Sequence, residues 1–318
     1  MAFAYSLSRC VYVAARLGIA DLLAGGGKTV ADLAAATDTN ADALYRMLRA
    51  LASEGVFVER EPRVFALTPL AETLRDDAPD SLRPMVLWLG DHMHESAYAE
   101  FEYSVRTGKR AFDRVFGQPP FEYLAGHPED AEVFNRAMGS FSQAQIPAIA
   151  EAYDFSRFGS IADIGGGLGH LLRGILARYP EAQGILFDLP ETVANAKDLP
   201  ADRCSVVSGS FFESVPSADA HVLKHIIHDW DDDSARRILE NCRSSISPNG
   251  RLLTIEMILP PMNEPGFAKL LDLEMLLLPG GRERTADEFR ELYTATGFEL
   301  TNVIPTRSPV AIIEGKPI

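Results

Sequence analysis

The second half of the chain alternates short β-rich runs with helical stretches, and this alternation limits the folds open to it. Helical segments such as 168–178 and 232–246 separate the runs from Phe158 onward. Strands that alternate with helices form a parallel sheet covered on both faces, an α/β doubly wound fold. The last two runs are joined only by residues 305–309, which suffices for a hairpin, so the last strand should be antiparallel. We therefore expect a mostly parallel, seven-stranded sheet with an antiparallel last strand, formed by Ile161–Ile164, Gly184–Asp188, Cys204–Ser208, His221–Lys224, Arg251–Met257, Phe298–Ile304 and Val310–Glu314.

The first 80 residues follow a different order, in which helices precede a small hairpin. Apolar residues at helical spacing predict one helix over 5–24, ended by the glycines that begin at Gly25. The elements expected after it are a short helix capped by Thr29, a helix over 40–53 preceded by Asn40, and hairpin strands at 56–58 and 64–67. Helices followed by a hairpin are typical of a winged helix.

Many winged helices bind DNA, but the charge of this chain argues against that role. Its net charge is -15 at pH 7, which repels nucleic-acid phosphates and anionic membrane surfaces. The helix over 40–53 offers only Arg46 and Arg49. We expect no nucleic-acid partner and no membrane partner, and we assign the N-terminal domain to dimerisation, which predicts a homodimer. A winged-helix regulator that senses a nucleoside is the alternative.

These patterns divide the chain into three regions. Residues 1–80 form the winged-helix-like, mainly helical dimerisation domain, residues 81–157 a helical linker with an acceptor pocket, and residues 158–318 the α/β domain. The middle region is rich in aromatic residues, which can pack in a core or together line a pocket for a flat ligand: Trp88, Phe101, Phe112, Phe116, Phe121, Phe134 and Phe141.

The cysteines and the apolar segments bear on the compartment. Cys10, Cys204 and Cys242 are odd in number and widely separated, so they indicate neither a disulfide framework nor a zinc site. No long uncharged run fits a signal peptide or a membrane span. We expect a cytoplasmic protein without a metal.

The most informative motif is a glycine-rich turn between an expected strand and an expected helix, at residues 161–170. Glycines permit a tight turn and let a ligand approach the backbone. The dinucleotide fingerprint GxGxxG would require glycine where His170 stands, which disfavours an NAD-dependent dehydrogenase as an alternative. Asp188 ends the next strand, 19 residues after Gly169, where a carboxylate can accept hydrogen bonds from ribose hydroxyls. The turn and Asp188 together predict a nucleoside site, in which Asp163 braces the loop or meets a ligand's ammonium group.

Four motifs occur in a specific order along the C-terminal half. They are Asp163-Ile-Gly-Gly-Gly-Leu-Gly169, Phe187-Asp-Leu-Pro190, Leu223-Lys-His-Ile-Ile-His-Asp-Trp230 and Pro279-Gly-Gly-Arg-Glu-Arg-Thr285. With them the chain resembles, over essentially its whole length, the S-adenosylmethionine-dependent O-methyltransferase family, which includes plant caffeate and flavonoid enzymes and bacterial enzymes that modify polyketides and phenazines. Residues 17–22 and 44–51 resemble that family's dimerisation region. The resemblance implies that residues 158–318 form the methyltransferase domain and that S-adenosylmethionine is converted to S-adenosylhomocysteine.

The resemblance also implies a set of cofactor residues. Ser210 stands where the family usually has Asp, so a shorter, uncharged group, or a water molecule that it holds, would meet the adenine amino group. Trp230 would pack near the adenine or in the core. The expected cofactor-binding residues are Asp163, Gly165, Gly167, Asp188, Leu189, Ser210, Phe211, Phe212 and Lys224.

The catalytic prediction centres on His228, which follows the end of an expected strand and occupies the family's base position. A histidine can be neutral near pH 7 and accept the proton of a phenolic hydroxyl. Glu256 and Glu283 match positions that flank this base and would orient its ring, as in catalytic triads. The alternatives are surface carboxylates and, for Glu283, an ion pair with Arg282 or Arg284. His225 is implied to have no catalytic role.

The acceptor is expected to be a small aromatic molecule with a hydroxyl group. Met and Phe side chains form a compliant apolar slot for a planar ring. The residues at the family's acceptor positions are Met138, Phe141, Asp272 and Met275. The alternative function is a protein of the same fold that binds S-adenosylmethionine without transferring the methyl group, or that methylates nitrogen or carbon.

Overall fold

The computed structural model describes residues 3–318 and divides into two compact units. The first unit comprises Met1–Ser96 and Leu124–Phe141, and the second comprises Ala97–Tyr123 and Ser142–Ile318. Helix α11 (Pro128–Ala152) belongs in part to each unit. Residues 81–157 are thus shared between the units, and the predicted three-part division of the chain stays a prediction.

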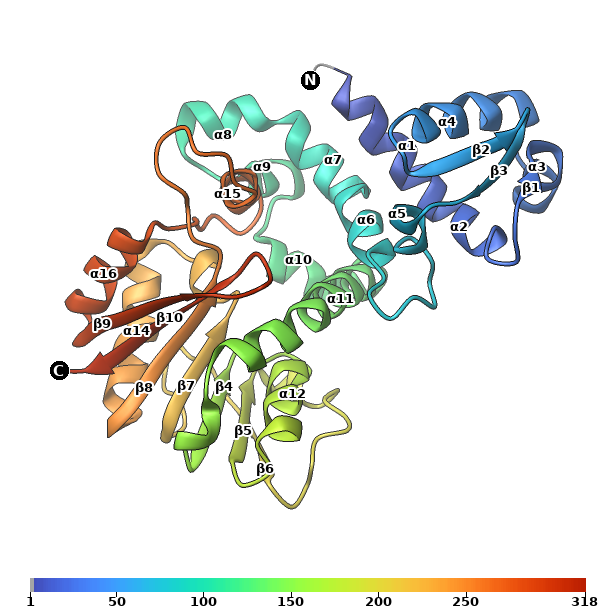
Figure 1. The fold of residues 1–318 in the computed structure, drawn as a ribbon. Coiled ribbons are helices and arrows are strands. Elements are labelled where there is room, and N and C mark those ends of the chain that lie inside the picture. The colour runs from blue at the N-terminus through green and yellow to red at the C-terminus, as the bar shows by residue number, and fades with distance from the viewer. Residues whose placement is uncertain (1–2) are drawn as a thin grey trace. The chain divides into compact units, whose positions relative to one another are not determined.

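The first unit combines helices with a three-stranded sheet of order β1-β3-β2 (Figure 1). Its core contains Leu33, Leu48, Phe57 and Phe65, all at most 1% exposed. A winged-helix-like, mainly helical domain is confirmed. Its elements are α1 (Ala4–Arg16), α2 (Ile19–Leu22), β1 (Lys28–Thr29), α3 (Val30–Thr37), α4 (Ala41–Ser53), β2 (Phe57–Glu61), β3 (Val64–Leu67), α5 (Pro69–Glu72), α6 (Arg83–Leu89) and most of α7 (His92–Ala99).

The single helix expected over 5–24 is wrong, because α1 ends at Arg16 and α2 begins at Ile19. Gly18 between them has φ +67°, a left-handed conformation that ends a helix and favours glycine. Both predicted helix caps are confirmed: the Thr29 hydroxyl accepts from the Asp32 N–H, and the Asn40 side chain accepts from two N–H groups of the first turn of α4.

The second unit is built on a seven-stranded sheet of order β6-β5-β4-β7-β8-β10-β9. β10 pairs antiparallel with both β8 and β9, whereas the pairs among the first five strands of that order are parallel. The predicted mostly parallel sheet with an antiparallel last strand is confirmed. Its strands are β4 (Ser160–Ile164), β5 (Gln183–Asp188), β6 (Cys204–Ser208), β7 (Ala218–Lys224), β8 (Ile246–Glu256), β9 (Phe298–Pro305) and β10 (Ala311–Pro317).

Strands β7 and β8 begin earlier than the sequence pattern predicts. Ala218 pairs with Ile246, and a register shift then brings Ala220 opposite Arg251. The four residues 247–250 lie in β8 between these pairs as an irregularity, and three of them are poor strand formers, namely Pro248, Asn249 and Gly250. The extra pairing depends on the neighbouring strand, which a single-strand pattern does not reveal.

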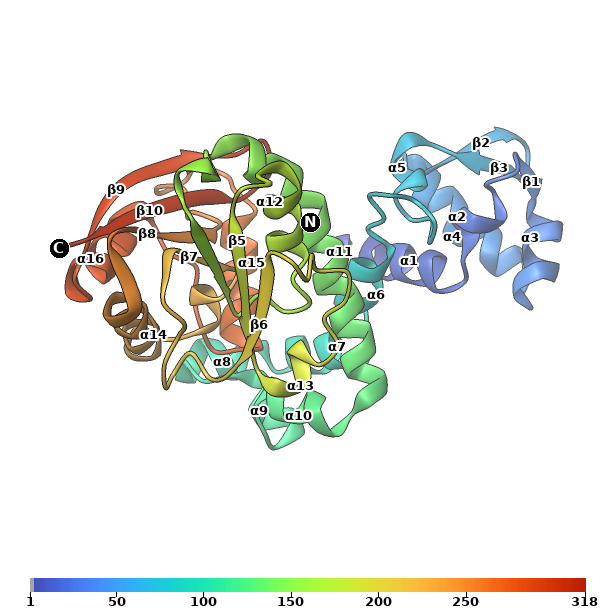
Figure 2. The same cartoon turned by 90° about the horizontal axis from the view of Figure 1, so that it is seen from below.

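Helices cover both faces of this sheet, with α12 (His170–Arg178) on one side and α14 (Asp232–Ser245) and α16 (Ala286–Ala295) on the other (Figure 2). The remaining elements of the unit are α8 (Phe101–Thr107), α9 (Ala111–Phe116), most of α10 (Pro120–Gly126, of which 124–126 belong to the first unit), η1 (Phe155–Arg157), α13 (Pro190–Val193), η2 (Ile227–Asp229) and α15 (Ala268–Leu277). The strand order reverses next to β4, and ligands of open α/β sheets bind at the carboxyl ends of the strands beside such a reversal. Within residues 3–318, none of the helices combines the length and apolarity needed to cross a membrane.

Candidate active site

The glycine-rich turn lies at the carboxyl end of β4 and leads into α12. Gly165, Gly167 and Gly169 have φ values of +69°, +58° and +76°, which side-chain-bearing residues rarely adopt. A Cβ atom on Gly165 would lie 2.5 Å from Cδ1 of Ile226, so this position has no room for a side chain. At Gly167, no atom would lie within 4 Å of an added Cβ. The turn therefore presents open backbone to a ligand at Gly167.

Asp188 ends β5 and supports this turn. Its Oδ2 accepts a hydrogen bond from the Gly167 N–H at 2.8 Å, and its Oδ1 accepts from the Leu189 N–H at 2.7 Å. Burial raises the pKa of Asp188, while these two N–H donors oppose the shift. Each carboxylate oxygen has a further lone pair, so the side chain can brace the turn and still accept from ribose hydroxyls.

Asp163 is the buried acid beside the turn. It is 2% exposed, and its Oδ2 has no hydrogen-bond partner among residues 3–318. Burial raises its pKa to about 7, against the opposing charge of Lys224. Burial also lowers the pKa of Lys224 to about 8, although Asp163 and Glu256 act in the opposite direction. A buried carboxylate with an unused oxygen suits a ligand that carries a positive charge.

Three aromatic rings form a cluster near the same turn. The ring centroids of Phe212 and Trp230 are 4.7 Å apart and those of Phe211 and Trp230 are 6.0 Å apart, both edge-to-face. The Asn241 side chain donates to the Phe211 carbonyl oxygen at 2.8 Å, which anchors the segment. The Ser210 hydroxyl accepts from the Phe212 N–H at 3.3 Å, so it contributes to the turn itself.

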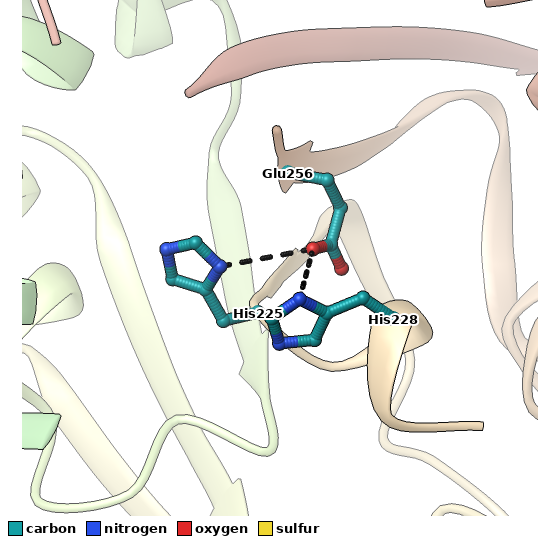
Figure 3. Close-up of side chains that lie close together, drawn as sticks. All are labelled: His225, His228 and Glu256. Atoms are coloured by element: carbon teal, nitrogen blue, oxygen red, sulfur yellow. Dashed lines mark ion pairs between the residues drawn. The ribbon is translucent and has the colours of Figure 1, made fainter. Parts of the chain in front are cut away.

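His228 lies on η2, just after β7, and is 7% exposed. Its Nδ1–H donates to Glu283 Oε1 at 2.7 Å, and Nδ1 also lies 3.5 Å from Glu256 Oε2 (Figure 3). Its Nε2 lies 3.5 Å from Asp229 Oδ1. Burial lowers the pKa of His228, but the nearby Glu256, Asp229 and Glu283 outweigh burial and raise it to about 10. These three carboxylates therefore make the ring a stronger base than a free histidine.

Glu256 at the end of β8 is fully buried, which excludes the surface alternative. Its Oε1 accepts from the N–H groups of Ile226 and Ile227 at 3.1 and 3.0 Å. Burial raises the pKa of Glu256, but His228, His225 and the Ile227 N–H together outweigh burial and hold the pKa below its usual value. The carboxylate thus holds the start of the segment that carries His228.

Glu283 is 1% exposed and likewise no surface acid. Burial raises its pKa, and the hydrogen bond from His228 opposes this. Arg282 pairs with Asp232 and Glu288, and Arg284 pairs with Asp232, so the alternative ion pair with Glu283 is not formed. The Glu283 N–H donates to Asp272 Oδ1 at 2.8 Å, which places Asp272 behind the carboxylate that contacts His228.

Sequence reasoning missed the contacts of His225 and did not identify Gln145 at all. His225, with φ +53°, lies 3.7 Å from Glu256 Oε2 through its Nδ1. Burial lowers its pKa to about 3, and its Nε2–H donates to the Gln145 side-chain oxygen at 3.1 Å. Because His225 lies three residues before His228, its position near Glu256 could have been suggested from the sequence. No local pattern identifies Gln145.

The four predicted acceptor residues belong to different units. Met138 and Phe141 lie in the first unit, whereas Asp272 and Met275 lie on α15 in the second. Their assignment to acceptor binding stays a prediction.

The chain matches two family models. Residues 98–299 match an O-methyltransferase domain, and residues 1–77 match an O-methyltransferase dimerisation domain. This chain belongs to the S-adenosylmethionine-dependent O-methyltransferase family. The predicted family is therefore confirmed, and the dehydrogenase alternative is wrong.

Similar O-methyltransferases and related enzymes extend this finding. The phenazine O-methyltransferase PhzM of Lysobacter antibioticus is 46% identical over 99% of this chain and 94% of that protein. The 8-amino-8-demethylriboflavin N,N-dimethyltransferase of Streptomyces davaonensis is 36% identical over 96% of this chain and 90% of that protein. A solved structure of the O-methyltransferase NcsB1 from neocarzinostatin biosynthesis contains S-adenosyl-L-homocysteine and 1,4-dihydroxy-2-naphthoic acid. It matches with a TM-score of 0.80 and 33% identity, covering 98% of this chain and 96% of that one.

Proposed function

We propose that this protein transfers a methyl group from S-adenosylmethionine to a hydroxyl of an aromatic small molecule. The observation that carries the proposal is the hydrogen bond of 2.7 Å between His228 Nδ1 and Glu283 Oε1, in a chain of this family. The name of the phenazine enzyme and the aromatic acid bound to NcsB1 support a flat aromatic acceptor.

The cofactor residues fit the chemistry of the proposed donor. When bound, S-adenosylmethionine supplies an electrophilic methyl group on a sulfonium. The open backbone at Gly167 and the spare lone pairs of Asp188 suit a nucleoside. Leu189, which directly follows Asp188 at the end of β5, belongs to the same proposed site. The unpartnered Oδ2 of Asp163 suits the ammonium group. Phe211 and Phe212 offer ring faces or edges to the adenine. Ser210 and Lys224 complete the proposed cofactor-binding residues.

The two nitrogens of His228 have different roles in this proposal. Because Nδ1–H donates to a carboxylate, Nε2 is the atom that takes the hydroxyl proton. The pKa of His228, about 10, is close to that of a phenol, about 10 for tyrosine. The proton transfer is therefore near balance. Glu283 and Glu256 orient the ring as positioning residues.

We also propose that the protein is a homodimer that acts in the cytoplasm. The match of residues 1–77 to a dimerisation domain supports the first statement. The free state of Cys10, Cys204 and Cys242 accords with a reducing compartment.

The His228→Ala variant tests the base role. We expect the affinity for S-adenosylhomocysteine, measured by calorimetry, to change less than about twofold, and turnover of a phenolic acceptor to fall ~100- to 10,000-fold. The exposed His127, changed to Ala, is the matched control and should retain turnover. Turnover of His228→Ala at the wild-type level would reject the base.

A second candidate function is methylation of an aromatic amine, favoured by the name of the dimethyltransferase relative. Paired acceptors that differ only in a hydroxyl or amino group on one ring distinguish the two, with the methylated product identified by mass spectrometry. Preferential methylation of the amine would replace the proposed hydroxyl acceptor.

A further inference from the structure

Two imidazole nitrogens and one carboxylate oxygen face one another at the carboxyl ends of β7 and β8 (Figure 3). His225 Nδ1 lies 3.7 Å and His228 Nδ1 lies 3.5 Å from Oε2 of Glu256. The three ligand atoms all lie within 4.8 Å of one another. Two imidazoles and a carboxylate are a ligand set that zinc uses in proteins.

Glu256 provides an independent reason to expect a cation at this point. Its Oε1 is occupied by two backbone N–H groups, whereas Oε2 has no hydrogen-bond partner among the described residues. The side chain is fully buried. A buried carboxylate oxygen without a partner is unfavourable, and a cation would satisfy it.

The orientation of His225 suits the same ligand. Its Nε2–H donates to the Gln145 oxygen at 3.1 Å, and its Nδ1 faces Oε2 of Glu256 at 3.7 Å. A hydrogen bond from the second ring nitrogen is how proteins orient metal-binding histidines. The side chains of His225 and His228 remain 13% and 9% exposed, so a small ion can reach them.

We propose that Zn²⁺ binds between His225 Nδ1, His228 Nδ1 and Glu256 Oε2 and inhibits the enzyme. Tetrahedral zinc with bonds of about 2.0–2.1 Å separates its ligand atoms by about 3.3 Å, so the 3.5 and 3.7 Å distances need only small shifts. Glu283 Oε1, 2.7 Å from His228 Nδ1, can supply the fourth ligand once the hydrogen bond between them is given up. The ion is an inhibitor and not a cofactor of methyl transfer.

Inhibition follows from the tautomer that the metal requires. A neutral imidazole bound to zinc through Nδ1 carries its only proton on Nε2. In the proposed reaction Nε2 must instead have a free lone pair for the proton of the acceptor. This consequence rests on the proposed base role of His228, whereas metal binding itself does not.

Metal binding is tested without any activity measurement. Tag-free protein is titrated with Co²⁺, whose visible absorption reports tetrahedral coordination, and with Zn²⁺ in competition with a chromophoric chelator. We expect one ion per chain, at least ~10-fold weaker binding in His225→Asn, and wild-type binding in the exposed control His127→Asn. No ion bound to the wild type, or equal affinity in His225→Asn, would overturn the site.

A measurement on the wild type alone covers the case that His225→Asn does not fold. The electron paramagnetic resonance spectrum of bound Cu²⁺ should show coupling to two imidazole nitrogens, and a spectrum with none or one would overturn the proposal. In methyl-transfer assays Zn²⁺ should inhibit reversibly, with a half-inhibitory concentration raised at least ~10-fold in His225→Asn. Zinc bound with turnover unchanged would reject the inhibition and the base role, but not the metal site.

Discussion

The ring of His228 is held from one edge only. Glu283 accepts from Nδ1 at 2.7 Å, and the Glu283 backbone N–H is in turn bound to Asp272 at 2.8 Å. Asp229 is the only charged group paired with Nε2 among the described residues, at 3.5 Å, beyond the range of a hydrogen bond. The nitrogen proposed to accept the proton is therefore the one not hydrogen-bonded to the protein.

Glu283→Gln removes the charge beside Nδ1 but keeps the size of the side chain. The amide can present its NH₂ group to the ring and favour the wrong tautomer, so we expect turnover to fall ~100-fold or more while the affinity for S-adenosylhomocysteine is retained. Steady-state kinetics and calorimetry measure the two effects. Glu291→Gln, at an exposed position on α16, is the control and should leave both values unchanged. A proportional loss of cofactor affinity would instead indicate a collapsed site.

A second residue-scale prediction concerns stability and His221, which is fully buried in β7. Burial lowers its pKa to about 4, although its hydrogen bond to the Pro216 carbonyl acts in the opposite direction. Between pH 6.5 and 4 the unfolded chain binds a proton that the folded chain does not, so this group destabilises the fold as the pH falls. The full effect is roughly 3 kcal/mol.

His221→Gln keeps a side-chain N–H and removes the titration. The free energy of unfolding, from urea denaturation, should fall more steeply for the wild type than for the variant as the pH decreases from 6.5 to 4. The two curves should run parallel above pH 7. Parallel curves over the whole range would show that His221 does not titrate as its burial implies.

At the scale of elements, the segment 280–284 fixes the segment that contains η2. The Arg282 N–H donates to the His228 carbonyl oxygen at 2.8 Å. Arg284 is 2% exposed and donates to the carbonyl oxygens of Ile227 and Trp230, each at 3.0 Å, and to Asp232. These contacts lie on both sides of His228, so they set the position of its backbone.

Arg284→Met should therefore affect both stability and catalysis. Loss of the buried guanidinium removes the donor to the Trp230 carbonyl oxygen, one of the two donors to the Ile227 carbonyl oxygen and the ion pair with Asp232, and should lower the free energy of unfolding by about 2–4 kcal/mol. Among molecules that remain folded, kcat should fall more than cofactor affinity, and Arg284→Lys should restore part of it. Arg282→Met is the control, because its half-exposed ion pairs contribute ~1 kcal/mol or less. Equal effects of both variants would contradict the special role of Arg284.

Elements and site residues that depend on local sequence could be predicted. The caps Thr29 and Asn40 act within one turn of their helices, and the glycine turn depends on backbone angles that only its own residues determine. His228 was found through a contiguous motif. The family resemblance, not periodicity, supplied the expectation that Glu256 and Glu283 lie beside it.

Features that depend on distant packing could not be predicted. Gln145 and His225 are 80 positions apart, and Asp272 and Glu283 meet only because α15 returns toward the sheet. The break at Gly18 was missed because the apolar spacing continues across it. The raised pKa of His228 results from Glu256 and Glu283, which lie on other segments, and from the adjacent Asp229. Apart from the break at Gly18, which is a local feature of the backbone, these features rest on tertiary contacts without a local signal.

At the scale of the whole molecule, the two units carry different tasks. The sheet unit contains all the residues of the proposed cofactor and proton-transfer site, whereas residues 1–77 match a dimerisation domain. That domain also has exposed apolar side chains on α1: Tyr5 is 63% and Val13 is 36% exposed. They lie eight positions apart, about two helical turns, and hence toward the same side of the helix.

A homodimer should therefore depend on α1. Light scattering after gel filtration should give twice the chain mass of 34.8 kDa for the wild type. A charge in a desolvated interface is strongly unfavourable, so Val13→Asp should shift the protein to the monomer mass at micromolar concentration. Val105→Asp places the same charge at a 66% exposed valine on α8, outside the matched dimerisation domain, and should leave the mass unchanged. If Val13→Asp keeps the dimer mass while Val105→Asp loses it, the chains associate through the sheet unit, and residues 1–77 do not form the interface.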